Sequence, residues 1–270
     1  MKEGYWVVRT YESGAVGEKT KFWVQGARPS RRSKRKEKSE IKKQEQNEYS
    51  ALKQMARLLN ANFHKGDLLL GLDYSPAGME KLEAYIAEHP FPAAESGEQE
   101  ADHLEQLRLA ADREMKLCLR RAKRELAKAG VALKYIAITS DMDGDTGEQV
   151  RVHHHLVVNE EARDVFVQKW QELGGVDWSP LSGQEDYTPV AEYMLRQVRH
   201  VPDEKKYVSS RNLVRPQPKD RVVISDAEIR VPKGGRLLFR GEFKPGRPQY
   251  IRYIIPEGKR KAPPGEETTA

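Results

Sequence analysis

The 270-residue chain contains a single cysteine, Cys118, and its longest apolar stretch runs only from about Leu68 to Leu72. One thiol excludes a disulfide framework and a cysteine-based zinc site, and it suits a reducing compartment. The short apolar runs exclude a membrane span, and no apolar segment follows the charged N-terminal residues as it would in a signal peptide. We therefore expect a cytoplasmic protein without a membrane partner.

The chain also lacks a glycine-rich phosphate-binding loop that ends in Gly-Lys, and it has no internal repeat. Because that loop holds the nucleotide phosphates in a helicase motor, we expect no helicase within this chain.

Positive charge is present but unevenly placed. There are 47 Lys and Arg residues against 41 Asp and Glu, which gives a net charge of +6 and a pI near 9.2. Residues 28–43 hold nine basic and two acidic side chains, a net charge of +7, so the other 254 residues sum to −1. Such a segment neutralises DNA phosphates without reading base sequence. A solvated leader has the same composition; the candidate DNA-binding residues are Arg31, Arg32, Lys34, Arg35 and Lys36.

The pattern of apolar residues predicts an α+β protein. Helical spacing occurs near residues 49–60, 104–126, 160–173 and 188–200. Strand-like runs occupy residues 67–74, 134–139, 149–158 and 176–178, and Ser75–Gly78 is typical of a turn. This order favours an antiparallel sheet with helices on one face, a ferredoxin-like arrangement. Cys118 lies on the apolar stripe of the long helix, where we expect a core residue.

Composition divides the chain into four parts. Residues 1–46 form an N-terminal extension with the basic arm, and residues 47–216 form the central domain. Residues 217–256 are a β-like extension that either enlarges the sheet or forms an appendage. A tail rich in Lys, Pro, Gly and Glu, residues 257–270, is expected to be disordered.

Three consecutive histidines lie inside a predicted strand. Because side chains alternate along a strand, His153 and His155 share one face, about 7 Å apart, while His154 lies on the mostly apolar other face. Two imidazoles at this spacing can bind one metal ion. A cluster of histidines without a ligand role is the alternative.

The predicted helix at 188–200 carries a tyrosine away from its apolar stripe. Tyr193 lies roughly 130° from the centre of that stripe, so a core position is not expected. Arg196 follows almost one turn later and places a permanent cation beside the phenol. A surface Tyr-Arg pair is the alternative.

Together these motifs resemble the HUH rolling-circle replication initiators of plasmids and phages, most closely the branch related to filamentous-phage gene II replication proteins. The resemblance spans roughly residues 43–216. It includes three segments upstream of the histidines and one downstream: Lys43–Asn47, Leu59–Phe63, Gly66–Tyr74 and Tyr207–Pro216.

The resemblance implies an HUH endonuclease domain that nicks and rejoins single-stranded DNA at a replication origin in a bacterial host cell. His153 and His155 would bind a divalent metal, and Tyr193 would attack the scissile phosphate. The products would be a 5′-phosphotyrosine and a 3′-hydroxyl that primes replication. Imidazole ligands suit Mn²⁺ better than Mg²⁺, although Mg²⁺ is more abundant. A host helicase would supply unwinding.

Three positions depart from the family pattern. His154 stands where a bulky apolar residue is usual, so it must be neutral and hydrogen-bonded if it is covered. Arg196 stands where lysine is usual, and it cannot shuttle a proton. The family's acidic third metal ligand has no clear counterpart; Asp141 is the candidate, with Glu148 and Gln149 as alternatives.

The sequence predicts a single nucleophile, because Tyr187 precedes the helix and position 197, where a second tyrosine would fall, is glutamine. Arg211 and Asn212 are candidate contacts to single-stranded DNA, although turn formation explains the asparagine equally well. A relaxase or single-strand transposase would use the same chemistry. From another class, a basic DNA-binding regulator without catalysis would explain the weak third-ligand position.

Overall fold

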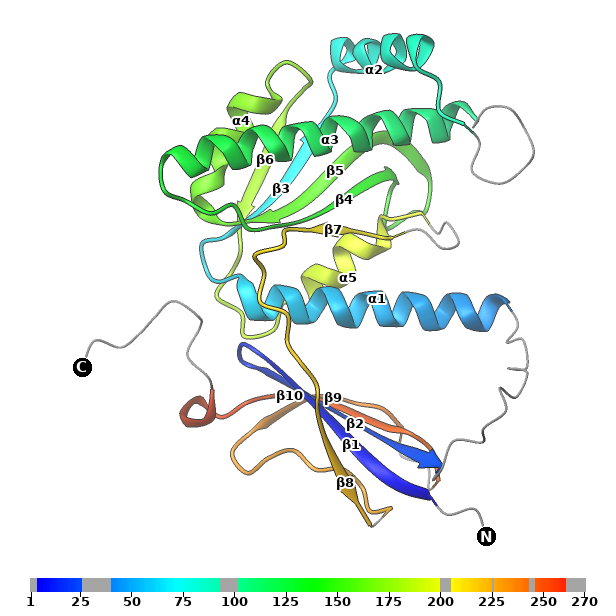
Figure 1. The fold of residues 1–270 in the computed structure, drawn as a ribbon, viewed down its shortest axis with the longest axis vertical. Helices are drawn as coiled ribbons and strands as arrows, with labels where there is room; N and C mark the ends of the chain where they lie inside the picture. Colours follow the sequence, from blue (N-terminus) through cyan, green and yellow to red (C-terminus); the bar gives the residue numbers. More distant parts are fainter. Residues whose placement is uncertain are drawn as a thin grey trace. The chain divides into compact units, whose positions relative to one another are not determined.

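The computed structural model describes residues 4–25, 40–92, 102–199, 205–224, 226–242 and 246–260, with backbone alone at 40–46 (Figure 1). It divides into two compact units. We call residues 1–62, 185–188 and 214–270 the terminal unit, and residues 63–184 and 189–213 the central unit. The described residues contain five α-helices and two five-stranded antiparallel sheets, which confirms the α+β class.

The sheet of the central unit has the triple histidine on its middle strand. Its strand order is β6-β3-β5-β4-β7, and every pairing is antiparallel. The strands are β3 (Leu68–Asp73), β4 (Tyr135–Met142), β5 (Gln149–Val158), β6 (Val176–Pro180) and β7 (Val208–Ser209). All four strands expected in this region are present, and the short β7 adds a fifth.

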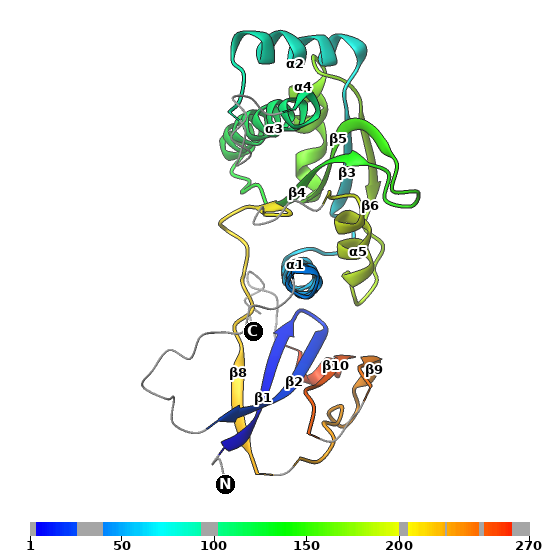
Figure 2. The same cartoon turned by 90° about the vertical axis from the view of Figure 1, so that its right-hand side faces the viewer.

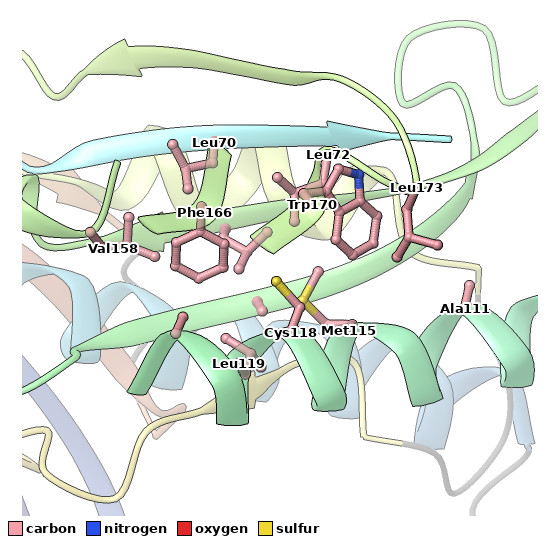
Figure 3. Packing of buried hydrophobic residues seen from close by; sticks show 14 of the residues in the cluster. Leu70, Leu72, Ala111, Met115, Cys118, Leu119, Val158, Phe166, Trp170 and Leu173 are labelled. Atoms are coloured by element: carbon pink, nitrogen blue, oxygen red, sulfur yellow. The ribbon is translucent and has the colours of Figure 1, made fainter. Parts of the chain in front are cut away.

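Helices α3 (His103–Lys128) and α4 (Arg163–Trp170) cover one face of this sheet (Figure 2). Figure 3 shows Phe166 and Trp170 between the strands and α3, with Met115 and Cys118 beneath them. Cys118 is a buried core residue, as predicted, and burial raises the pKa of its thiol to about 12. The apolar residues of α3 therefore form the side of this core that lies opposite the sheet.

One predicted turn is wrong. Ser75 is instead the N-cap of helix α2 (Pro76–Glu88): its Oγ accepts a hydrogen bond from the Gly78 amide at 3.1 Å. Proline is favoured at the first helical position for the same reason that it is favoured in turns, namely its preset φ. Gly78 allows the helix to approach the chain closely, since a Cβ there would lie 1.8 Å from the Leu173 carbonyl oxygen.

The two extensions, predicted as separate segments, form a single sheet in the terminal unit. Its strand order is β8-β1-β2-β10-β9. The strands are β1 (Gly4–Ser13), β2 (Val16–Gln25), β8 (Lys219–Val223), β9 (Arg236–Arg240) and β10 (Gln249–Ile254). The N-terminal hairpin has two open edges, and a hairpin alone is marginally stable. Strands from beyond residue 217 pair with both edges, a long-range partnership that no local pattern reveals.

Helix α1 (Glu40–Asn62) belongs to the terminal unit and begins inside the segment predicted as a basic arm. The five candidate DNA-binding residues of that arm, residues 31–36, lie outside the described residues. So do residues 261–270 of the tail that was predicted to be disordered. The start of that tail, Glu257–Lys259, forms a 3₁₀ turn.

We expect Phe166→Ala to lower the free energy of unfolding of the central unit by about 3–5 kcal/mol, because it leaves a cavity between α3 and the sheet. Urea denaturation followed by circular dichroism measures this. The adjacent Val167→Ala, at an exposed position, should change stability by less than about 0.5 kcal/mol. Equal losses in the two variants would contradict this packing.

Candidate metal and tyrosine site

Strand β5 separates its histidines between the two faces of the sheet. Val152, Leu156 and Val158 point into the core with α3, and His153 and His155 point to the opposite face. The rings of His153 and His155 meet edge to face, with centroids 4.9 Å apart. The alternation predicted from the sequence thus holds, and it places two imidazoles side by side on one surface.

The middle histidine, His154, is fully buried and bonded through both ring nitrogens. The Tyr74 hydroxyl donates to its Nε2 at 3.0 Å, and its Nδ1 donates to Thr139 Oγ1 at 2.9 Å. Thr139 in turn donates to the Asp112 carboxylate. Each link uses one proton, so a single neutral tautomer satisfies the chain. Burial, reinforced by the flanking histidines, lowers the pKa of His154 to about 3. The expectation of a neutral, hydrogen-bonded His154 is confirmed.

Helix α5 (Thr188–Arg196) brings the tyrosine to the two histidines. It is shorter than the predicted 188–200, and its buried side in the central unit includes Ala191 and Met194. Tyr193 is 39% exposed, and its ring lies edge to face with His155, centroids 5.4 Å apart. Tyr193 is therefore off the apolar stripe, as predicted, and beside the imidazole pair.

The residue that joins the two histidines is Gln197. Its Oε1 lies 2.8 Å from His155 Nε2 and 3.3 Å from His153 Nε2. Both imidazole Nε2 atoms thus lie within hydrogen-bonding distance of the same amide oxygen. From the sequence alone, position 197 was of interest only because it holds glutamine and not a second tyrosine. Its position four residues after Tyr193 could have indicated a role in the site, because helical residues at this spacing lie on the same face.

Two residues of the β4–β5 hairpin hold Gln197 in place. The Ser140 hydroxyl donates to the Gln197 backbone carbonyl. Gly144 packs against its side chain, because a Cβ at Gly144 would lie 2.7 Å from Gln197 Cγ. The hairpin that carries the histidines therefore also positions the oxygen that meets them.

The two Nε2 atoms differ in this structure: His155 Nε2 donates to the Gln197 amide oxygen at 2.8 Å, and a bound metal ion would replace that proton. His153 Nδ1 donates to the Arg151 carbonyl at 2.9 Å, so in the neutral ring the lone pair is on Nε2, which faces Gln197. Burial, with a smaller contribution from His153, lowers the pKa of His155 to about 4, against the opposing effect of its Gln197 contact. Two imidazole nitrogens with one amide oxygen would suit a divalent transition ion such as Mn²⁺ better than Mg²⁺.

The acidic third ligand is not where the sequence predicted it. Within the described ranges, no three or more His, Cys, Asp or Glu side chains gather as a metal-binding group. A register shift between Ser140 and Met142 interrupts the strand at Asp141, whose nearly buried carboxylate pairs with Arg199 at 2.8 Å. The two alternatives, Glu148 and Gln149, are exposed at the start of β5. Gln197 lies where Asp141 was expected.

The other predicted residues are more dispersed. Arg196 is exposed on α5 and forms an ion pair with Asp145 of the β4–β5 turn at 3.5 Å. Arg211 is exposed. The Asn212 side chain donates to the Leu133 carbonyl at 3.2 Å, which gives it a structural role. Tyr187 is buried in the terminal unit, as suits a residue that is not a nucleophile.

Comparison with models of protein families, with curated proteins and with solved structures gives no match for this chain. Among the helices that the structure describes, none has the length and apolarity needed to cross a membrane. The function must therefore be argued from the geometry of the site.

We expect Gln197→Ala to weaken Mn²⁺ binding by about tenfold or more, since loss of a ligand should cost at least as much as loss of an outer-shell partner. Gln197→Glu should bind Mn²⁺ at least as tightly as the native protein, because a carboxylate oxygen replaces the amide oxygen. Calorimetric titration with Mn²⁺ in the absence of DNA measures both. Glu192→Ala, at an exposed position of α5, is the control. Native affinity in Gln197→Ala would show that Gln197 is not a ligand.

We expect His154→Leu to destabilise the central unit by about 1–3 kcal/mol, because it leaves the buried Tyr74 hydroxyl without its partner. Adding Tyr74→Phe to this variant should cost less than Tyr74→Phe costs in the native protein, since the hydroxyl that it removes has already lost its partner. Denaturation of the two single variants and the double variant gives the coupling. Strictly additive losses would mean that the two side chains do not interact.

Proposed function

We propose that the central unit is a metal-dependent strand transferase of the HUH type, which nicks and rejoins single-stranded DNA through Tyr193. One observation carries this proposal: the His153 and His155 Nε2 atoms converge on one oxygen beside the Tyr193 ring. The antiparallel sheet, with the histidines on its middle strand and α3 and α4 on the opposite face, supports the ferredoxin-like HUH arrangement.

In this proposal Tyr193 is the nucleophile. A bond forms between its phenol oxygen and phosphorus, and the bond from phosphorus to the 3′ oxygen of the departing strand breaks. The strand ends are then a 5′-phosphotyrosine and a 3′-hydroxyl, which can prime synthesis or attack the phosphotyrosine to rejoin the strand. The phenol proton passes to solvent, to which Tyr193 is open.

The histidines and Gln197 would hold the divalent ion. When bound, the ion would neutralise charge on the scissile phosphate and favour the phenolate, which matters because a phenol ionises only near pH 10 in water. His154 acts behind the site: its bonds to Tyr74 and Thr139 tie β5 to both neighbouring strands. The two ligands on either side of His154 in sequence are therefore held in one register.

Arg196 supplies a permanent positive charge near the nucleophile. Its guanidinium can hold a phosphate oxygen in exchange for Asp145, and it cannot take the phenol proton. Its role is therefore electrostatic, and Arg196 is the one cation of α5 in the central unit.

The arrangement favours an enzyme over a non-catalytic regulator. A non-catalytic regulator would explain why the sequence offers no clear acidic third metal ligand. Gln197, however, provides an oxygen donor beside the two histidines. A rolling-circle initiator acting at a replication origin with a host helicase remains our leading proposal. A relaxase or a single-strand transposase would share the chemistry, and the DNA that is cleaved distinguishes them.

Incubation with labelled single-stranded origin DNA and Mn²⁺ or Mg²⁺ should yield a covalent protein–DNA adduct that resists denaturing electrophoresis. EDTA should abolish the adduct, and Tyr193→Phe should remove it completely because the attacking oxygen is gone. Tyr5→Phe, which changes a tyrosine of similar exposure (42%) in the terminal unit, should form as much adduct as the native protein.

An adduct that persists in Tyr193→Phe would show that Tyr193 is not the nucleophile. Cleavage that is indifferent to EDTA would remove the metal role of His153, His155 and Gln197.

A further inference from the structure

The two units carry opposite net charges. The terminal unit contains 28 Lys and Arg against 16 Asp and Glu, a net charge of +12, whereas the central unit contains 19 against 25, a net charge of −6. Even without the +7 of residues 28–43, the terminal unit carries +5. The near-neutral balance outside that segment therefore arises from two opposite charges that cancel. A phosphate backbone is attracted by the terminal unit and repelled by the central unit.

The terminal unit also exposes aromatic rings around a lysine. Phe239 of β9, Tyr250 of β10 and Tyr49 of α1 form a cluster that we call the aromatic patch. The Tyr250 ring centroid lies 6.0 Å from that of Phe239 and 6.3 Å from that of Tyr49. The Lys53 ammonium lies 3.5 Å from the Tyr250 centroid and 4.0 Å from the Tyr49 centroid.

The outer two rings of the patch are accessible, since Tyr49 is 48% and Phe239 is 47% exposed. Single exposed apolar residues are normal on a protein surface. Here two half-exposed rings, one on α1 and one on β9, flank the Tyr250 ring that the Lys53 ammonium contacts, and they offer flat surfaces at which both stacking and charge attraction are possible.

The central ring is held rigidly. The Tyr250 hydroxyl donates to Glu18 at 3.0 Å, and Arg57 forms two bonds to the Glu18 carboxylate at 2.9 and 2.7 Å. Arg57 thus offsets the charge of the Glu18 carboxylate. Among the residues that the structure describes, no carboxylate forms an ion pair with Lys53; its ammonium lies over the Tyr250 and Tyr49 rings, and burial lowers its pKa to about 8, so it carries its charge below that pH.

We propose that the aromatic patch binds single-stranded DNA, with unpaired bases stacked on Phe239 and Tyr49 and with Lys53 beside a phosphate. The proposal rests on the proposed function insofar as that function makes single-stranded DNA the substrate. Stacking on exposed rings requires bases that are not already stacked in a duplex, and it tolerates any sequence. An acidic peptide would use the charge but not the rings. The affinity for DNA then resides in the terminal unit, and the acidic central unit contributes the chemistry.

Binding is measured with the full chain in EDTA, so that no cleavage occurs, by fluorescence anisotropy of labelled oligo(dT). Phe239→Ala and Tyr49→Ala should each weaken binding by about fivefold or more. Phe239→Leu should weaken it similarly because leucine retains apolar volume without a ring, and Phe239→Tyr should bind as the native protein does. Circular dichroism checks that each variant is folded.

Trp178→Ala is the matched control. Trp178 of the central unit is 48% exposed and has the Arg163 guanidinium 4.9 Å from its ring centroid, yet it belongs to the acidic unit. Its loss should leave oligo(dT) affinity unchanged. Native affinity in both Phe239→Leu and Tyr49→Ala, or an equal loss in Trp178→Ala, would overturn the proposal.

Competition identifies the ligand class. Unlabelled oligo(dT) should displace the probe, while duplex DNA and poly-glutamate should compete poorly. Equal competition by duplex or by poly-glutamate would show that charge alone is responsible, and stronger competition by oligo(U) would assign the patch to RNA; either result overturns the proposal.

The outcome is separable from that of the proposed function. Patch variants that lose affinity while the native protein forms no adduct would refute the nickase alone. Patch variants that bind normally, while Tyr193-dependent adduct forms, would refute the patch alone.

Discussion

A histidine buried in the middle of an apolar core is unfavourable unless both of its ring nitrogens are bonded, and His154 meets that condition through Tyr74 and Thr139. Tyr74 follows β3 and Thr139 lies on β4, so the bonds engage the chain on both sides of β5. A shift of β5 by one residue would break both bonds and move His153 or His155 into the core. The hydrogen bonds of His154 therefore fix the register on which the candidate site depends.

The candidate site combines one strand with the segment that follows one helix. β5 supplies two imidazoles at alternate positions, and the turn after α5 supplies the Gln197 oxygen, with Tyr193 one turn before it. Ser140 and Gly144 connect the hairpin to Gln197 through a hydrogen bond and a close van der Waals contact. The position of Tyr193 relative to His153, His155 and Gln197 therefore depends on contacts between residues that are far apart in sequence.

The distribution of charge suggests that the two units contribute differently to nucleic-acid binding. The central unit, to which we assign the proposed catalysis, has a net charge of −6 and gains little affinity from a phosphate backbone. A terminal unit of net charge +12 supplies long-range attraction for any nucleic acid. In this unit β9 presents Phe239 and α1 presents Tyr49 and Lys53, which in our proposal add a preference for unpaired bases.

Several features were determined by the sequence alone, because local patterns set them. Alternation along β5 put His153 and His155 on one face, and helical spacing put Cys118 in the core and Tyr193 outside it. Only the tertiary structure decided the rest. It placed the Gln197 oxygen beside the two histidines, while a register shift at Asp141 and the ion pair with Arg199 engage the Asp141 carboxylate elsewhere. It also joined strands from the two chain extensions into one sheet, since strand pairing depends on open edges rather than on distance in sequence. Summed over the chain, the charge showed only a small basic excess; the opposition between two units became visible when the fold assigned each residue to one of them.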